Sequence, residues 1–213
     1  NICSWIKGMY SVALTSEMDA VIGVIEGDCS NTHSLMSTLT DKNIDVISFS
    51  FPHNKNRKKL AEEIEKLEHY FNVDHAKVLE IKEQLDKIRK KLITLDELTF
   101  KENKVTGLEN HLWLVNSSDF NGDPVDFEKR LDEFILEAEN RNPINADLKF
   151  GFLGVPPIIT DFYDFLLEHN VNVVFNEIQR QFSMPYLEND IVDQYLHYTY
   201  PYTIFDRLKD IQK

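Results

Sequence analysis

The sequence predicts an α/β protein in which two Rossmann-like parallel-sheet segments are joined by a helical connector. Strand–helix–strand patterns occupy residues 19–54 and 147–177, and residues 57–140 between them carry helical periodicity. A strand–helix–strand unit this compact requires a right-handed crossover between two parallel strands. The predicted segments are the carboxyl-terminal part of a first α/β domain at 1–54, the connector at 55–146, and the start of a second α/β domain at 147–213.

The first pattern begins with an uninterrupted apolar run at 20–25, which has the length of a strand buried on both faces. Residues 33–39 are predicted to form a short helix. Residues 44–49 form the next predicted strand, which Pro52 ends. The first of these strands is therefore expected to be buried on both faces, as is typical of parallel sheets.

The connector repeats apolar residues at helical spacing. In residues 60–71, 81–95, 105–115 and 127–138, apolar side chains recur every three or four positions. The stretch 81–95 has the spacing of a coiled-coil seam but spans barely two heptads, so an amphipathic helix packed on its own protein is the favoured interpretation. Asp123 is the predicted N-cap of the last helix, and Pro124 is its first residue.

The second pattern starts with a predicted strand at 148–153 and a turn at 154–157. Pro157 favours the start of a helix over 158–168, and residues 171–175 form the following strand. The tail from residue 190 onward is predicted to be helical, with an interruption at Pro201. Helix is expected to exceed strand by about two to one.

The composition excludes several classes of protein. The 213 residues carry 23 Lys and Arg against 36 Asp and Glu, a formal net charge of −13. Such a chain lacks the clustered cations of a phosphate-backbone binder, so no nucleic-acid partner is expected. The sequence shows no apolar run near the roughly 18 residues of a membrane span, no signal-peptide pattern and no Gly-rich nucleotide motif. Two cysteines make no disulfide framework, and a cytoplasmic protein without a membrane partner is expected.

The ends of the sequence indicate a piece of a longer protein. Residue 1 is Asn rather than Met, and residues 3–6 already have the composition of a protein interior. Residues 206–213 form a charged run with no closing strand. Elements beyond both ends are therefore expected.

Cys29 follows the first predicted strand and immediately precedes a helix. Gly27 permits a tight turn there, and Asp28, Ser30 or Asn31 can cap the helix. A thiol in this position meets unpaired backbone N–H groups and the positive end of the helix dipole, which favour a thiolate or a bound anion. A nucleophilic or cluster-binding thiolate and an inert buried cysteine are equally compatible with this spacing.

Cys3 lies 26 positions before Cys29, and the sequence contains no Cys-x-x-Cys pair. The common ferredoxin and zinc-ribbon patterns are therefore absent, and two cysteines cannot fill a four-ligand site alone. His33 is as compatible with an ordinary helix-surface residue as with the base of a nucleophile.

Five short segments resemble the 2-hydroxyacyl-CoA dehydratase/benzoyl-CoA reductase family, and together they extend over essentially the whole chain. They are CSWIKG at 3–8, EGDCSNTH at 26–33, KVTGLENH at 104–111, GFLGVPPI at 151–158, and VFNE at 174–177 with Arg180. The first two resemble the surroundings of the family's first two cluster cysteines. Each segment is weak alone, and their joint occurrence carries the resemblance.

The resemblance implies two Rossmann-like domains around a cleft that holds an oxygen-sensitive [4Fe–4S] cluster. Three cysteines of one subunit hold such a cluster; Cys3 and Cys29 match two of them, and the third is not in this chain. The resemblance also implies an ATP-hydrolysing iron–sulfur activator protein and a homologous or identical partner subunit. The implied enzyme is a dehydratase-type lyase or reductase. It uses one-electron (ketyl radical) chemistry on a 2-hydroxyacyl-CoA or an aromatic acyl-CoA under anaerobic conditions.

Two other functions stay open at this point. A branch with the same fold carries a double-cubane iron–sulfur cluster and reduces small molecules without CoA. A non-catalytic scaffold relative would have inert cysteines. The iron content after anaerobic purification distinguishes the three: about four iron ions per chain, about eight, or none.

Further candidate residues follow from sheet geometry. Open α/β sheets bind ligands outside the carboxyl ends of their strands, which makes Ser30, Gly154, Pro156, Glu177 and Arg180 candidate cleft-lining residues. A surface or interdomain ion pair is the competing interpretation of Glu177 and Arg180. With two ligands, the chain alone is expected to hold no stable cluster. The two sulfurs are expected to point toward a common space without forming a disulfide.

Overall fold

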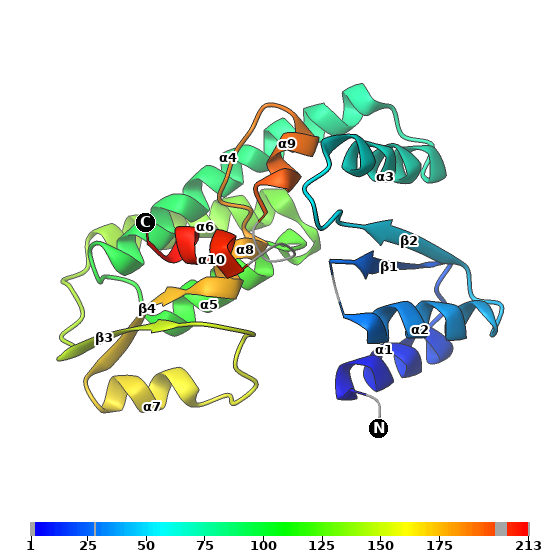
Figure 1. The fold of residues 1–213 in the computed structure, drawn as a ribbon. Helices are drawn as coiled ribbons and strands as arrows, with labels where there is room; N and C mark the ends of the chain where they lie inside the picture. The colour runs from blue at the N-terminus through cyan, green and yellow to red at the C-terminus, as the bar shows by residue number, and fades with distance from the viewer. Residues whose placement is uncertain (1–2, 28, 199–203, 213) are drawn as a thin grey trace. The chain divides into compact units, whose positions relative to one another are not determined.

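A computed structural model describes residues 3–27, 29–198 and 204–212 (Figure 1). The chain divides into two compact units: unit 1 is Asn1–Asp74 with Pro201–Asp210, and unit 2 is His75–Tyr200 with Ile211–Lys213. The described part of each unit contains a two-stranded parallel sheet, so the predicted α/β class with two small parallel sheets separated by helices is confirmed. The segment boundaries near residues 54 and 146 stay predictions.

Unit 1 contains the first strand–helix–strand pattern. Its elements are α1 (Ser4–Thr15), β1 (Val21–Glu26), α2 (Ser30–Thr40), β2 (Val46–Ser50) and α3 (Arg57–Tyr70). Val21 pairs with Val46 in parallel register, which confirms the predicted parallel pairing of the two strands. Helix α1 has no counterpart among the predicted elements. The interruption predicted at Pro201, shortly before α10 (Ile204–Ile211), lies outside the described residues, as does the proposed cap Asp28.

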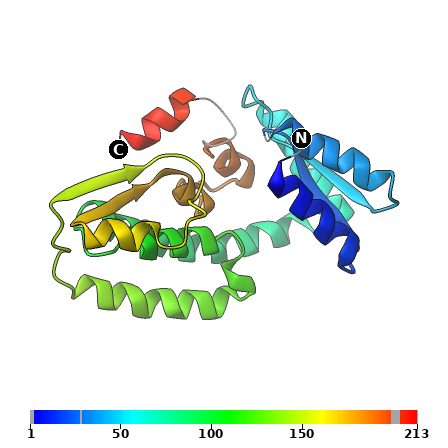
Figure 2. The ribbon, with the colours of Figure 1, turned by 90° about the horizontal axis from the view of Figure 1, so that it is seen from below.

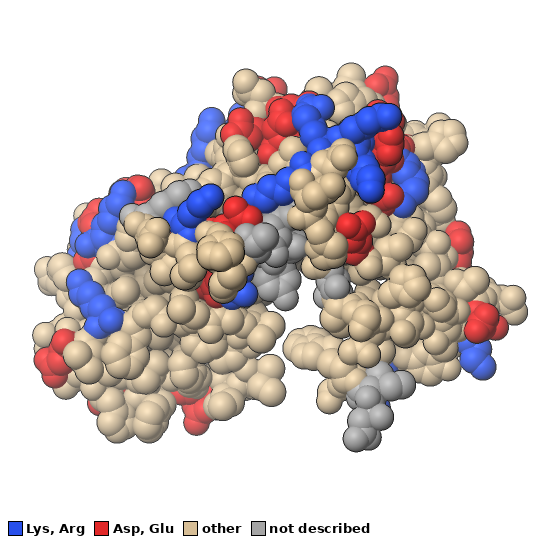
Figure 3. Space-filling model, viewed as in Figure 1, with Lys and Arg blue, Asp and Glu red and all other residues tan. Residues whose placement is uncertain are grey.

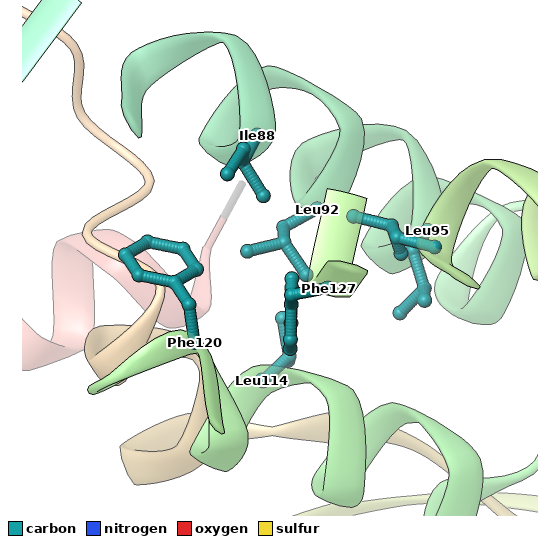
Figure 4. Close-up of a cluster of buried hydrophobic side chains, with 7 residues drawn as sticks. Ile88, Leu92, Leu95, Leu114, Phe120 and Phe127 are labelled. Atoms are coloured by element: carbon teal, nitrogen blue, oxygen red, sulfur yellow. The ribbon is translucent and has the colours of Figure 1, made fainter. Parts of the chain in front are cut away.

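Unit 2 is built on the helices of the connector. They are α4 (His75–Phe100), α5 (Gly107–Asn116), the 3-10 helix η1 (Phe120–Gly122) and α6 (Pro124–Glu139), with α6 lying along α4 (Figure 2). Their apolar side chains form one buried cluster (Figure 4): Ile88, Leu92, Leu95, Leu114, Phe120, Phe127 and Leu131. The predicted helices of residues 57–140 are therefore confirmed as α3 to α6, and the apolar positions of α4, α5 and α6 supply this core.

The sheet of unit 2 consists of β3 (Leu148–Phe152) and β4 (Val171–Asn176), connected through α7 (Phe162–Glu168). Helix α8 (Glu177–Phe182) follows β4 directly, and α9 (Ile191–Leu196) comes later. The strands pair in parallel, beginning with Leu148 opposite Val171. Strand β4 is largely buried and contacts α5, whereas β3 is largely exposed.

Two predictions about the amount of helix and strand are wrong. The helix predicted over 158–168 begins four residues later, at Phe162. Ile158 is 83% exposed and Ile159 is 63% exposed, so a helical turn there would gain little stability from packing. Helix exceeds strand by far more than two to one, because each described strand has only five or six residues.

The helices expose charged side chains of both signs (Figure 3). Lys91 of α4 pairs with Glu128 and Asp132 of α6, each at 2.7 Å, and Lys101 pairs with Glu97 at 2.6 Å. Exposed pairs of this kind contribute little stability, so these residues form a solvated face. None of the helices that the structure describes is both long enough and apolar enough to cross a membrane.

The N-cap of α6 has the predicted chemistry. Asp123 Oδ1 accepts hydrogen bonds from the backbone N–H groups of Val125 and Asp126, each at 3.0 Å, and Pro124 is the first helical residue. We expect Asp123→Ala to lower the free energy of unfolding by about 1 kcal/mol, because two amide donors lose their acceptor. Urea unfolding followed by circular dichroism measures this loss. Glu133→Ala, at an exposed position of the same helix, is the control, and an equal loss in both variants would contradict the capping role.

Candidate functional site

Cys3 and Cys29 each occupy the residue immediately before a helix. Cys3 is the N-cap of α1 and Cys29 is the N-cap of α2, both with an exposed side chain. Within the described residues, neither first turn contains a carboxylate. The first-turn N–H groups and the positive end of each helix dipole therefore lie beside a cysteine, and no acidic residue of the first turn itself neutralises them.

Helices α1 and α2 pack side by side (Figure 1) and run in the same direction. A pocket of about 370 Å³ lies between them, lined by Ile6, Lys7, Tyr10, Asn31, Ser34, Leu35 and Thr38. Because residues near the start of α1 face residues near the start of α2, the two N-termini lie at the same end of the helix pair. The structure thus brings Cys3 and Cys29 to one end of unit 1, as two thiols that no disulfide joins.

Ser30 and Asn31 do not cap α2, so the prediction is wrong for these two residues, and Asp28 lies outside the described residues. Cys29 takes the N-cap position because its backbone is extended (φ −78°, ψ 155°), and Ser30 is already the first helical residue. Ser30 is exposed beside Cys29, which keeps it a candidate residue of the same site.

Gly154 and Glu177 connect the carboxyl ends of the two strands of unit 2. The Gly154 N–H donates to Glu177 Oε2 at 3.0 Å, and Glu177 is buried. Gly154 has a φ of +118°, which other residues rarely adopt, so a glycine is needed where the chain leaves β3. Pro156 follows in the same loop and is half-buried. Glu177 therefore anchors the loop that follows β3.

Arg180 forms an ion pair with a residue of α4. Its Nε lies 2.6 Å from Asp96 Oδ2, with both side chains largely buried, and its guanidinium lies over the Phe175 ring. This pair links α8 to α4 inside unit 2. Arg180, Glu177 and Gly154 all belong to unit 2, while Cys3, Cys29 and Ser30 belong to unit 1.

A family model described as 2-hydroxyglutaryl-CoA dehydratase, D-component, matches residues 1–213. The chain belongs to this family. No curated protein matches it. The match confirms the resemblance to this family that the short segments, including those around the cysteines and at 151–158, indicate. The family is one of dehydratase components.

In this member of the dehydratase family, the cysteines fit only part of an iron–sulfur site. Thiolates at helix N-termini are suited to an anionic metal–sulfur group. The sequence holds two cysteines, and no group of three or more His, Cys, Asp or Glu side chains in the described ranges is arranged to hold a metal ion. Cys3 and Cys29 could therefore supply two ligands, and the remaining ligands would have to come from elsewhere.

A buried polar network of this family member has no counterpart in the sequence predictions. Its members are Asp96, Thr99, Asn110, His111, Tyr163, Asn176 and Gln179. Asn110 and His111 end the KVTGLENH segment, and Asn176 lies within VFNE. The presence of these three residues in the two segments is the signal in the sequence that could have identified part of the network.

Proposed function

We propose that the chain is the cluster-carrying component of an iron–sulfur dehydratase that removes water from a 2-hydroxyacyl-CoA by one-electron chemistry. The observation that carries the proposal is the placement of Cys3 and Cys29 at the N-termini of two parallel helices, in a chain of the dehydratase family. Exposed thiols at such helix ends can bind an anionic cluster, whereas thiols packed in a core could not.

Each part of the candidate site has a physical role under this proposal. Cys3 and Cys29 would bind the cluster as thiolates, and the N–H groups of α1 and α2 would stabilise its negative charge. When bound, a [4Fe–4S] cluster supplies a one-electron centre and a Lewis-acidic iron wherever a protein ligand is missing. Glu177 would hold the loop after β3 in one conformation, so that its backbone is positioned before substrate arrives.

The proposed partners follow from what the sequence lacks. It has no P-loop or Gly-rich nucleotide motif, so ATP hydrolysis is assigned to a separate iron–sulfur activator that donates the electron. It has no third cysteine, so the ligand set is completed outside these 213 residues. A homologous or identical subunit, an acyl-CoA substrate and a cytoplasmic, low-oxygen setting complete the proposal.

Anaerobic reconstitution with iron(II) and sulfide tests the ligand assignment. We expect the chain alone to retain no stable cluster, because metal affinity falls steeply when a ligand is missing. Adding a small thiol such as 2-mercaptoethanol supplies the missing ligand, and about four iron ions per chain are then expected. Iron and sulfide analysis with visible absorption measures the outcome. About eight iron ions would favour the double-cubane reductase instead.

Cysteine variants make the test specific. Cys3→Ser and Cys29→Ser should each bring the thiol-assisted iron content close to zero, since one protein ligand cannot hold a cluster against solvent. Ser37→Ala, an exposed change in the body of α2, should leave it unchanged. Iron binding that survives both cysteine changes, or no iron under any condition, would favour a scaffold relative with inert cysteines.

A further inference from the structure

His111 and Tyr163 meet two amide side chains at the carboxyl end of β4. His111 Nδ1 lies 2.8 Å from Tyr163 Oη, which lies 2.8 Å from Asn176 Oδ1. Gln179 Nε2 is 3.5 Å from both Tyr163 Oη and His111 Nδ1. Parallel α/β sheets bind ligands outside the carboxyl ends of their strands, so these four side chains occupy a place suited to a ligand.

The direction of each hydrogen bond follows from the buried end of the network. The Asp96 carboxylate, paired with Arg180, can only accept, so Asn110 donates to it through Nδ2 and accepts through Oδ1. Asn176 Nδ2 donates to Asn110 Oδ1 at 2.9 Å. Asn176 Oδ1 therefore accepts, and the proton that it receives is that of the Tyr163 hydroxyl.

This direction determines the tautomer of His111. Because the Tyr163 hydroxyl donates to Asn176, its oxygen can only accept from His111, and Nδ1 must carry a proton. Burial raises the pKa of Tyr163 and lowers the pKa of His111, so the phenol keeps its proton and the imidazole is neutral near pH 7. The unshared electron pair is then on Nε2, which forms no hydrogen bond within the described part of the chain.

Gln179 adds a second acceptor that lacks a donor. Its side chain is fully buried, and its Nε2 group lies 3.5 Å from the Tyr163 oxygen, to which it donates. Gln179 Oε1 is then a buried oxygen without a hydrogen-bond partner among the described residues. Leaving such an acceptor unpaired costs about 1–3 kcal/mol, and orphaned atoms of this kind mark places that a ligand or water completes.

We propose that His111 Nε2, on the ring whose Nδ1 lies 3.5 Å from the Gln179 carboxamide, accepts a hydrogen bond from a neutral donor of the acyl-CoA and so positions the thioester in unit 2. The identity of the ligand rests on the proposed function. The two acceptors, His111 Nε2 and Gln179 Oε1, are uncharged and would not neutralise a cationic group of a ligand. The carboxylates of Asp96 and Glu177 already bind Arg180 and Gly154. A hydroxyl or amide N–H group is therefore favoured over an ammonium group.

An acyl-CoA offers this chemistry at two places, the 2-hydroxyl group of the acyl chain and the neutral hydroxyl and amide groups of the pantetheine arm. The ligands 2-hydroxybutyryl-CoA, butyryl-CoA and free pantetheine separate them. A shift of the His111 Nε2 resonance with the first ligand alone assigns the donor to the 2-hydroxyl group. A shift with all three assigns it to the pantetheine arm.

The tautomer is tested first, by ¹⁵N magnetic resonance of the histidine rings in the full chain near pH 7. We expect a protonated Nδ1 and an unprotonated Nε2 for His111, and loss of this preference in Tyr163→Phe, whose fold is checked by circular dichroism. A protonated Nε2 in the unmodified protein would overturn the proposal, because no acceptor would then face the ligand.

Binding is tested next, by calorimetry with the same three ligands. His111→Asn keeps an amide donor for Tyr163 but has no counterpart of Nε2, and about tenfold weaker binding is expected from the loss of one hydrogen bond. His33→Asn, an exposed histidine of unit 1, should bind as the unmodified chain does. Thioester binding that His111→Asn leaves unchanged would overturn this inference while the proposed function stands. Failure of both CoA thioesters to bind would overturn the two together.

Discussion

Replacing Phe127 with alanine is expected to lower the free energy of unfolding by about 3–5 kcal/mol. The Phe127 ring is fully buried in the core of unit 2 (Figure 4) and meets the rings of Trp113 and Phe120 edge to face, with centroids 5.2 and 5.4 Å away. Removing the ring leaves a cavity bounded by α4, α5 and α6. The free energy from burying the apolar ring is lost as well. Urea unfolding followed by far-ultraviolet circular dichroism measures the change in stability.

Leu136→Ala provides the matched control for this prediction. Leu136 lies on the same helix but is 64% exposed, so the same kind of truncation should change stability by no more than about 0.5 kcal/mol. Comparable losses in the two variants would mean that α6 does not bury the face described here.

Replacing Gly107 with alanine is expected to cost about 3 kcal/mol, although it adds a single methyl group. A Cβ atom there would lie 2.6 Å from Val173 Cβ, 2.8 Å from the Val173 carbonyl oxygen and 2.9 Å from Tyr163 Cδ1. Both Val173 atoms belong to the buried strand β4, and one of them is a backbone oxygen. The steric clash can therefore be relieved only if α5 moves away from the sheet. That movement would also weaken the bond from the Gly107 N–H to Asn172 Oδ1, which is 3.1 Å long.

Gly151→Ala tests whether the cost comes from this close approach. Gly151 lies in β3 of the same sheet, and the nearest atom to a Cβ there is Phe175 Cδ1 at 3.8 Å, an ordinary contact. We expect this variant to be at least as stable as the unmodified chain, since alanine also restricts the unfolded state. Thermal unfolding that ranks the two variants in the opposite order would refute the packing of α5 on β4.

Local signals in the sequence account for most of the individual elements. The apolar run at 20–25 predicted β1, and the periodicity of residues 57–140 predicted α3 to α6, because runs and spacings of apolar residues are local features of the sequence. The burial of that strand on both faces was not predicted correctly, since Gly23 is its one buried residue. Asp123 was identifiable as an N-cap because the donors that it satisfies are two and three residues away. The same local logic placed Cys29 at the start of a helix.

Local signals were insufficient where burial decides the outcome. Pro157 and the apolar residues after it are compatible with a helix, yet Ile158 and Ile159 pack against too little to stabilise one, and α7 begins at Phe162. Helix α1 was missed for a related reason. Its buried residues Ile6 and Ala13 stabilise the helix by packing on α2, and the sequence of α1 alone does not reveal this contact.

The sequence by itself determined the α/β class, the parallel order within each short sheet, the family, and the place of Cys29 at the start of a helix. Only the tertiary structure decided that α1 and α2 are parallel, that Arg180 pairs with Asp96, and that Asn176 and Tyr163 orient His111. The reason is the range of the interactions. A cap or an amphipathic stripe involves residues a few positions apart, whereas Asn176 meets Asn110 across 66 positions and Arg180 meets Asp96 across 84. Contacts of that separation exist only after the chain has folded, because they depend on which buried faces come together.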